Sequence, residues 1–465
     1  MSSHIDMLHG PTLGKLLLFA LPLIASGVLQ QSFNSADIAV AGRWAGSEAL
    51  AAVGSNGPVI SLIVNLFVGI SVGANVVIAR LIGQGDRERV RRAVSTSASV
   101  AIAGGLLLLV IGVAVARPIL EWLDTPPEVL GLAVEYLRIY SLGFPFMMIY
   151  NFGAAILRSF GDTRRPFYIL VASGIVNVAL NLLLVIGFGM GVAGVAVATV
   201  VSNAVSAVII TVLLMREPEP GRLDLRSMRP DRRALARILQ IGVPAGVQGM
   251  VFSISNVFIL GAINSLGAKV LAGSAAALNY ECYSYFVISA IAQTAVAFVS
   301  QNYGAGYYDR CRRIFMQCMM LSLAGSAILN IGFCLDKPFF AGIFTADPEV
   351  LVYAGQRMQY VLLVQFIASS YEIAGAAMRG LGYSMTPTVL TIFGTCVLRI
   401  VWLHTVCADN ITFRRVMLVY PVSWAITGVA VLAAYFIVAR RAFARGGVTE
   451  PVMPEAHCAE RRATP

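Results

Sequence analysis

The first side chain able to carry chemistry is an acid inside an apolar segment. Gln30, Asn34 and Asp37 follow one another at i, i+4 and i+7, which places them on one face of a helix. An ionisable side chain at the centre of a membrane costs about 2.5–3.5 kcal/mol, so its presence needs a functional or structural reason. A lone carboxylate on such a polar stripe is suited to bind a cation or to exchange a proton.

Two later apolar segments carry polar stripes that can meet this acid. Ser173, Asn177 and Asn181 recur at i, i+4 and i+8 in one segment, and Thr199 begins a similar stripe in the next. At about 1.5 Å of rise per residue, Asn181, Thr199 and Asp37 reach a common level in the outer half of the first six segments. A structural reading also remains open, because Asn and Ser hydrogen bonds hold membrane helices together.

The second half of the chain carries more charge inside its apolar segments. Glu281, Glu372 and Arg399 lie in three different segments, and helical rise places Glu281 and Arg399 at nearly the same level. Two acids around one base would hold these charges at a tolerable cost. We therefore expect the three to share one polar pocket, either as a structural ion pair or with a role in transport. Arg138 and Arg357 are expected to extend to the outer surface.

Composition predicts that membrane-spanning helices position these residues. Hydrophobic residues make up 58% of the chain and charged residues 12%, whereas a soluble domain carries about 25% charged residues. Apolar runs of the roughly 20 residues needed to cross a bilayer recur along nearly the whole chain. The runs lack strand alternation, and backbone polar groups in lipid must be satisfied internally. We predict an all-α integral membrane protein with twelve transmembrane helices.

The second half of the sequence repeats the first at an offset of 221 residues. A Pro-Glu-Val-Leu run at 127–130 returns at 348–351. Further pairs at this offset are Gly46 and Gly267, Gly83 and Gly304, Gly85 and Gly306, Arg89 and Arg310, Arg158 and Arg379, Gly161 and Gly382, and Pro166 and Pro387. A repeat of this kind in a hydrophobic chain is typical of transporters.

The repeat defines the expected domains. A first lobe at 1–215 and a second at 236–440, each of six helices, are joined by a basic, proline-containing linker at 216–235. The polar tail at 441–465 is expected to be disordered. Because each lobe has an even number of spans, the two pseudo-symmetric repeats should be parallel and related by an axis along the membrane normal.

The distribution of basic residues predicts the orientation. The links after the even-numbered segments carry 22 arginines, against 6 basic residues on the other face. By the positive-inside rule, these links and both termini should be cytoplasmic. The net charge of +10 follows from this placement, and the scatter of the arginines over short loops does not favour nucleic-acid binding. The apolar stretch at 16–25 continues into a polar stripe without a cleavage site, which favours a retained first helix over a signal peptide.

No pattern indicates an enzyme or a bound cofactor. The seven cysteines all lie in the second half without paired metal spacing, and the four histidines show no ligand spacing. The sequence has neither a nucleotide-binding loop nor a hydrolase elbow. We therefore expect no catalytic residues, no structural metal and no cofactor.

Several short motifs together resemble the multidrug and toxic compound extrusion (MATE) family. They are DIAVAG at 37–42, ALAAVG at 49–54, GQGD at 83–86, RSFGDTRRP at 158–166, SQNYGAG at 300–306 and MRGLG at 378–382. The resemblance covers about residues 12–440. It implies two six-helix lobes arranged in a V around a central cavity, and ion-driven export by alternating access.

The resemblance is strongest to the DinF-like branch, which places its coupling-ion site in the first lobe. Asp37, Asn151, Asn177 and Thr199 match that branch position by position. Asn181 stands where the branch carries an aspartate, so the coupling ion, proton or sodium, stays open. Other branches of the family keep carboxylates in the second lobe, where the charged residues named above are candidates to line the cavity.

The favoured function is a secondary active multidrug exporter that antiports organic cations or amphipathic compounds against protons or sodium. It would work as a monomer in the bacterial cytoplasmic (inner) membrane, with lipid and small-molecule substrates as partners. The alternative is a flippase of lipid-linked precursors or polysaccharide units with a related fold. Such flippases generally need a large cationic cavity, whereas acids at least match bases inside this chain.

Overall fold

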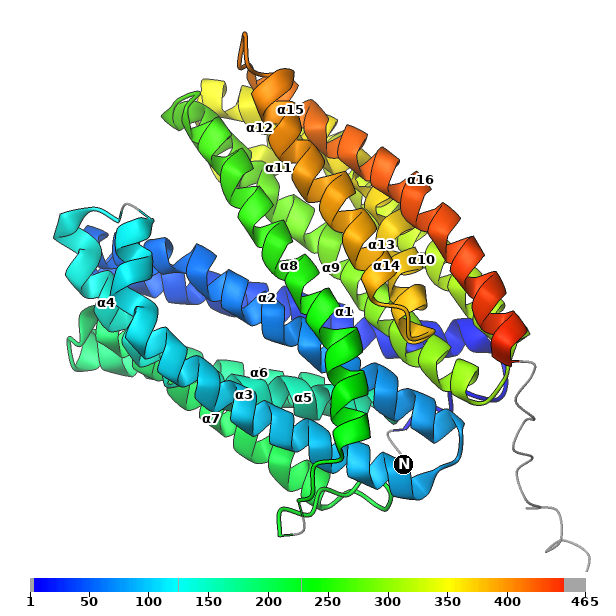
Figure 1. The fold of residues 1–465 in the computed structure, drawn as a ribbon. Helices are drawn as coiled ribbons and strands as arrows, with labels where there is room; N and C mark the ends of the chain where they lie inside the picture. Colours follow the sequence, from blue (N-terminus) through cyan, green and yellow to red (C-terminus); the bar gives the residue numbers. More distant parts are fainter. Residues whose placement is uncertain (1–3, 124, 227, 447–465) are drawn as a thin grey trace, which may run out of the picture.

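The computed structural model describes residues 4–123, 125–226 and 228–446, whose regular elements are all helices (Figure 1). The first lobe consists of α1 (Thr12–Val40) with the π-helical turn η1 (Ala41–Ala45), α2 (Ser47–Gly83), α3 (Arg87–Trp122), α4 (Pro127–Ser141), α5 (Phe144–Ser159), α6 (Arg164–Asn181) with the π-helical segment η2 (Leu182–Gly187), and α7 (Gly191–Met215). The second lobe consists of α8 (Arg232–Asn264), α9 (Ala268–Gly304), α10 (Tyr308–Leu335), α11 (Lys337–Gly342), α12 (Pro348–Tyr360) with the 3-10 segment η3 (Leu362–Ile367), α13 (Ala368–Gly380), α14 (Met385–Thr391) with the π-helical segment η4 (Ile392–Val397), α15 (Leu398–Thr405) and α16 (Phe413–Gly446).

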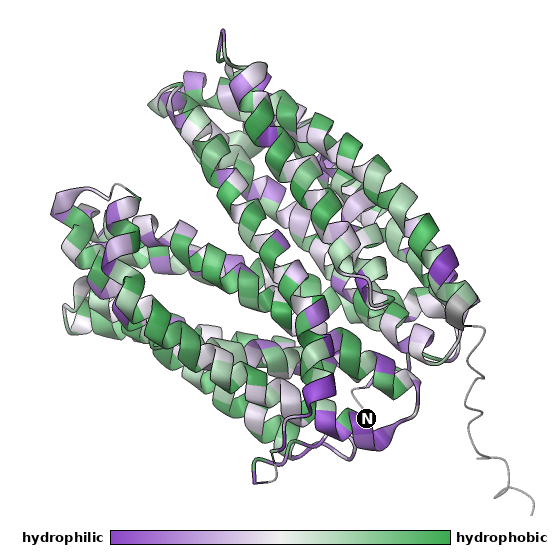
Figure 2. Ribbon diagram, in the orientation of Figure 1, coloured by the Kyte–Doolittle hydropathy of each residue, from purple (hydrophilic) through white to green (hydrophobic). Residues whose placement is uncertain are grey.

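The helices have the length and composition of membrane spans. Within the described residues, eleven helices can cross a bilayer, and twelve if the pair α4–α5, bent by 46°, forms one span. Figure 2 shows hydrophobic residues along the outer helix faces and hydrophilic residues gathered at the helix ends. The two lobes diverge as a V from a closed end near the N-terminus (Figure 1). The prediction of an all-α membrane protein is confirmed.

The element boundaries follow the sequence repeat. Ser47 and Ala268 begin α2 and α9, Gly83 and Gly304 end them, and both pairs are 221 residues apart. The same offset relates the first residues of α3 and α10, of α4 and α12, and of α6 and α14. Equivalent helices therefore occur in the same order in both lobes, as a parallel repeat requires.

Two boundaries differ from those expected. Helix α8 begins at Arg232, inside the predicted linker at 216–235, because the Asp231 side chain accepts a hydrogen bond from the Ala234 N–H at 2.8 Å and caps the helix. Helix α16 runs past residue 440 to Gly446. The rest of the predicted tail lies outside the described residues.

At the closed end, α2 of the first lobe touches α8 of the second backbone to backbone. A Cβ atom on Gly69 would lie 2.2 Å from the Cα atom of Gly246, and one on Gly73 would lie 2.9 Å from the backbone N of Gly242. Small residues are the means by which helices approach closely in lipid, where little hydrophobic driving force exists between them. Glycine at these positions therefore allows the two lobes to join.

A second glycine contact lies on the pseudo-symmetry axis. A Cβ atom on Gly83 would lie 2.0 Å from the carbonyl oxygen of Gln301, and one on Gly304 would lie 2.1 Å from the carbonyl oxygen of Arg80. Residues 80 and 83 correspond to 301 and 304 at the repeat offset, so each lobe presents the same patch to the other. This reciprocity is the property of a twofold interface.

The first helix of each lobe begins against the other lobe. The Thr12 hydroxyl at the start of α1 hydrogen-bonds Gln317 of α10, and the ring of Phe19 meets that of Phe298 edge-on at 5.4 Å. Just before α8, the backbone N–H of Asp231 donates to the Thr96 hydroxyl of α3 at 2.9 Å. Helices α1 and α8 therefore connect the two lobes.

Residues 4–10 form an N-terminal strap across the closed end. The Ile5 N–H donates to the Gly161 carbonyl of the first lobe at 3.1 Å. The Met7 carbonyl accepts a hydrogen bond from Asn302 of the second lobe at 3.0 Å, and the Met7 side chain is buried. The strap thus holds both lobes at once.

The strap is anchored by an ionic contact. Nε2 of His4 lies 3.4 Å from a carboxylate oxygen of Glu217, which also pairs with Arg165. The hydrogen bond to Glu217 raises the pKa of His4 against the opposing effect of burial. Burial alone would raise the pKa of Glu217, but the hydrogen bonds from His4 and Arg165 outweigh it and leave this pKa lowered.

Replacing His4 with glutamine should destabilise the protein in a pH-dependent way. The contribution of His4 is complete below its ordinary pKa of about 6.5 and is lost as the pH rises through its raised pKa in the folded protein. The contribution of Glu217 is lost as the pH falls through its own lowered pKa. The difference in thermal midpoint (Tm) from wild type should therefore be largest at about pH 5–6 and should fade at alkaline pH. A His404→Gln control, at an exposed histidine, should show no such profile, and a constant Tm difference across the pH range would contradict the account.

Adding one methyl group at the lobe junction should destabilise the fold. Gly246→Ala would place a Cβ atom 2.1 Å from the Leu66 carbonyl oxygen, and overpacking of this kind costs about 1–3 kcal/mol. Gly261→Ala, on the same helix with nothing within 4 Å, should be neutral or stabilising because alanine is the better helix former. Thermal unfolding in detergent measures both variants. Equal Tm values for the two would show that the close contact does not hold the lobes together.

Candidate functional site

Asp37 lies near the end of α1, beside the two asparagines of α6. Its Oδ1 atom accepts a hydrogen bond from Nδ2 of Asn181 at 2.5 Å, and the same nitrogen lies 3.3 Å from Oδ1 of Asn177. Both asparagines are buried, and Asp37 is half-buried. The structure thus places three of the predicted first-lobe site residues in one hydrogen-bonded cluster, which we call the Asp37 cluster.

A close approach of α1 to α6 positions the Asp37 cluster. A Cβ atom on Gly174 would lie 1.7 Å from the ring of Phe33, which stands one turn before Asp37. Because glycine leaves this space to the ring, the two helices come near enough for Asp37 to reach Asn181. The helix widens into the π-helical segment η2 directly after Asn181, a feature common at functional sites.

Two tyrosines of α4 complete the surroundings of the acid. Tyr136 and Tyr140 both interact electrostatically with Asp37, and their ring centroids are 5.8 Å apart. Each phenol can donate a hydrogen bond to a carboxylate. Sequence reasoning missed these residues, although their i, i+4 spacing placed them on one helix face.

The other two predicted residues of this site hydrogen-bond within their own helices. The Asn151 amide donates to the Met147 carbonyl at 2.9 Å, and the Thr199 hydroxyl donates to the Val195 carbonyl at 3.0 Å. Among the described contacts, neither side chain hydrogen-bonds Asp37. Their part in ion coupling stays a prediction.

The Asp37 cluster has the donors and acceptors for a small cation. Oδ1 of Asn181 is buried without a hydrogen-bond partner, and carboxylate and amide oxygens are the ligands that hard cations prefer. The described residues contain no group of three His, Cys, Asp or Glu side chains able to hold a metal ion. One carboxylate among neutral groups is therefore suited to a proton or a monovalent cation.

In the second lobe, Glu281 is paired with an arginine other than the one expected. Arg357 of α12 donates from Nε to Oε1 of Glu281 at 2.6 Å and from Nη2 to Oε2 at 2.9 Å, and it also donates to Ser274 at 2.5 Å. Arg357 is 4% exposed, so the prediction that it extends to the outer surface is wrong. The pair is a buried, bidentate ion pair.

The wrong prediction for Arg357 has a physical reason. Helical rise gives the depth of a residue in the membrane but not the side of the helix from which its side chain projects. Val350, Ala354, Arg357 and Met358 form the buried face of α12, so Arg357 projects toward α9. Its place on this apolar stripe, at i, i+4, i+7 and i+8, was the signal available in the sequence.

Arg399 is fully buried and has aromatic rather than acidic neighbours. Its guanidinium lies 5.2 Å from the ring centroid of Phe252 and 4.6 Å from that of Tyr420, within the range of cation–π contacts. Nη1 donates to Oδ1 of Asn256 at 3.2 Å. Arg357 lies 5.6 Å from the Tyr420 ring centroid, so this ring contacts both arginines.

Glu372 belongs to a third environment. Among the described residues it forms no salt bridge, and its electrostatic partner is the half-buried Arg379. Tyr371 interacts with both Glu372 and Arg399. The described salt bridges pair Glu281 with Arg357 and not with Arg399, so the three residues do not form one ion pair, and their shared polar pocket stays a prediction.

Comparison with known proteins agrees with this geometry. A family model described as MatE matches residues 22–183 and 244–403, well over half of the chain and parts of both lobes. The chain belongs to the multidrug and toxic compound extrusion (MATE) family. A probable multidrug resistance protein, YoeA of Bacillus subtilis, is 29% identical over 81% of the chain and 83% of its own length. A FAD transporter of Shewanella oneidensis is 26% identical over 76% of the chain and 78% of its own length.

The fold of this MATE protein matches that of solved transporters. A structure described as the outward-facing conformation of a multidrug resistance MATE family transporter superposes with a TM-score of 0.86. The match covers 97% of this chain and 100% of that chain at 22% identity. The likeness confirms the two-lobe, V-shaped fold.

Removing Arg357 should strongly destabilise this MATE protein. Arg357→Gln leaves Glu281 buried and uncompensated, which typically costs about 3–5 kcal/mol. Lys269→Gln, which breaks the exposed pair with Glu349 in the same lobe, should cost less than about 1 kcal/mol. Thermal unfolding of the two variants measures the contrast. Comparable losses would show that the Glu281–Arg357 pair is not the internal ion pair described here.

Proposed function

We propose that this MATE-family protein is a secondary active exporter that moves organic cations or amphipathic compounds out of the bacterial cell. Export would be driven by entry of protons or sodium. The observation that carries the proposal is the unequal chemistry of the two lobes. Glu281 is neutralised by Arg357, whereas Asp37 has only neutral hydrogen-bond partners among the described residues. Asp37 is thus an acid on which a cation can arrive and depart.

Helix α1 supports coupling between Asp37 and the lobe junction. The helix begins against α10 and α9 of the second lobe and ends at the Asp37 cluster. Pro22 lies inside α1, where it removes one backbone hydrogen bond and allows a bend. A proton or sodium ion on Asp37 would change the hydrogen bond with Asn181, and α1 can carry that change to the other lobe.

The basic loops indicate how this structure is oriented in the membrane. The links rich in arginine, together with the N-terminal strap and the linker, lie at the closed end of the V (Figure 1), and the positive-inside rule assigns this end to the cytoplasm. The V would then open to the exterior. In this state the cargo would leave, and the coupling ion would reach Asp37 from outside.

One observation favours the alternative of an anionic cargo. Nη2 of Arg399 is buried and lacks a hydrogen-bond partner within the described structure, and a guanidinium with such a donor is suited to a carboxylate or phosphate. The relative named a FAD transporter belongs to the same family. Under this alternative the protein would move anionic compounds, as a flippase of lipid-linked precursors does.

Asp37→Asn should abolish ion-coupled export, because the amide can neither carry the proton nor neutralise a bound sodium ion. In proteoliposomes with an imposed proton or sodium gradient, export of a cationic dye should fall at least about tenfold, the loss expected for one essential charged contact. Glu135→Gln, at an exposed acid of α4, is the matched control and should keep the wild-type rate. The gradient that drives wild-type export identifies the coupling ion.

Two results would contradict the proposal. Wild-type export by Asp37→Asn at matched protein density would remove Asp37 from the mechanism. Gradient-driven movement of an anionic dye, absent in Arg399→Gln while a cationic dye stays outside the substrate range, would instead select the alternative.

A further inference from the structure

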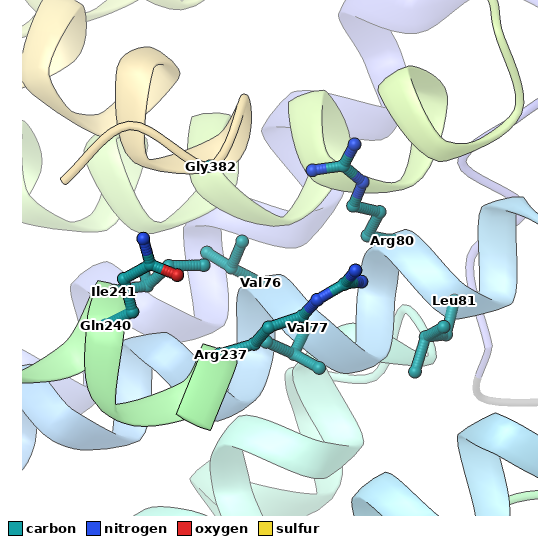
Figure 3. Close-up of a pocket in the computed structure, with 8 residues that line it drawn as sticks. All are labelled: Val76, Val77, Arg80, Leu81, Arg237, Gln240, Ile241 and Gly382. Atoms are coloured by element: carbon teal, nitrogen blue, oxygen red, sulfur yellow. The ribbon is translucent and has the colours of Figure 1, made fainter. Parts of the chain in front are cut away.

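Two adjoining cavities lie between the lobes at the closed end. The first has a volume of about 220 Å³ and the second about 160 Å³, and both are lined by Val77, Leu81 and Arg237. Helix α2 of the first lobe supplies Val77 and Leu81, and α8 of the second lobe supplies Arg237. We call the two together the seam pocket, and Figure 3 shows its first part.

The seam pocket is strongly basic. Arg80 of α2 and Arg237 of α8 line the first cavity, and Figure 3 shows the Arg237 side chain extending from α8 toward the part of α2 that carries Arg80. The second cavity is lined in addition by Arg89, Arg92 and Arg233. Its one acidic lining residue, Asp231, accepts the capping hydrogen bond of α8.

Several of these arginines have no anionic partner. Arg89 and Arg92 pair with Asp86 and Glu88 on their own surface. The salt bridges of the described residues leave Arg80, Arg233 and Arg237 without a carboxylate. Arg80 lies 4.7 Å from the ring centroid of Tyr303, and its Nε atom is buried without a hydrogen-bond partner. The pocket thus includes three guanidinium groups, of Arg80, Arg233 and Arg237, without a carboxylate partner among the described residues.

The sequence repeat identifies a site in the first lobe that is equivalent to part of the seam pocket. Gly382 lines the seam pocket, and its counterpart at the 221-residue offset is Gly161. The two glycines have φ angles of 92° and 90°, so the backbone turns in the same way. A Cβ atom on Gly161 would lie 2.3 Å from the Ile5 carbonyl oxygen. The site at Gly161 is therefore filled by the N-terminal strap.

Other residues that bind the N-terminal strap also have counterparts in the seam pocket. Arg310 donates to the carbonyl oxygens of Gly10, His9 and Met7 at 2.9, 3.1 and 3.4 Å, and its counterpart Arg89 lines the pocket. Asn302, which donates to the Met7 carbonyl, corresponds to Leu81. At the first site, the carbonyl oxygens of the strap accept hydrogen bonds from Arg310. The equivalent site in the other lobe is the seam pocket, which is a cavity.

We infer that the seam pocket binds a phosphate group. Guanidinium groups present forked donors that match phosphate oxygens, and a phosphate can accept from several of them at once. The group could come from an anionic lipid headgroup at the membrane surface or from a free phosphate compound. Because α2 and α8 belong to different lobes, the bound phosphate would hold the closed end together and stabilise this conformation over one in which the lobes separate there.

Binding of free phosphate tests the inference. Inorganic phosphate should raise the Tm of the purified protein in detergent relative to chloride at matched ionic strength. The side chain of Arg237 is exposed, so Arg237→Gln should fold. It should need about tenfold more phosphate for the same rise, the effect of one charge-assisted contact. Arg216→Gln, which removes an exposed arginine of the α7 end outside the pocket, should respond as wild type does.

A lipid arm separates the two sources of the phosphate group. Wild-type protein and both variants are compared in nanodiscs of phosphatidylglycerol and of phosphatidylcholine. A Tm rise with phosphatidylglycerol, lost only in Arg237→Gln, assigns a lipid headgroup, and a rise with inorganic phosphate, lost only in that variant, assigns a free phosphate compound. A response equal in Arg237→Gln and Arg216→Gln would mean general charge screening and would overturn the inference, as would the absence of any response.

Discussion

The backbone contact of α2 with α8 and α9 is the constraint on which the other features depend. Across the pseudo-symmetry axis, Gly83 of α2 packs against α9 and Gly304 of α9 packs against α2. Gly246 of α8 also packs directly against the backbone of α2. Because the lobes are joined at this one end, they diverge toward the other (Figure 1). The same twofold relation creates two equivalent sites beside the axis. One holds the chain's own strap, and the other is the arginine-lined seam pocket.

The two lobes share a backbone plan but not a chemistry. Four pairs of equivalent helices begin at matching residues, yet Asp37 corresponds to apolar Phe258, and Glu281 to Ile60. The first lobe keeps an acid with neutral partners, and the second neutralises its acid with Arg357. The function proposed above requires the lobes to move as similar bodies while the Asp37 cluster alone handles the coupling ion. Divergence of side chains on a conserved frame satisfies both needs.

The sequence correctly predicted features that depend on helical periodicity. It did not predict which neighbour a side chain faces or which distant segments are in contact. Helical spacing and rise correctly brought Asp37 to Asn181, because both quantities are fixed by helix geometry. The same rise misplaced Arg357, since it carries no information about which neighbour a side chain faces. The role of Gly174 depends on the ring of Phe33 from another helix. The N-terminal strap has no periodic pattern at all, so only the folded structure could reveal it.

Export by alternating access, which the proposed function requires, predicts that the lobes separate at the closed end when they approach at the open end. The most direct measurement is the distance between paired spin labels in a cysteine-free background. One pair is placed at the exposed repeat counterparts Arg91 and Arg312 of the closed end, and the other at Glu128 and Glu349 of the open end. When the ion gradient is reversed, the account predicts that the first distance lengthens as the second shortens. Distances that change in the same direction, or an unchanged closed end during active transport, would contradict it.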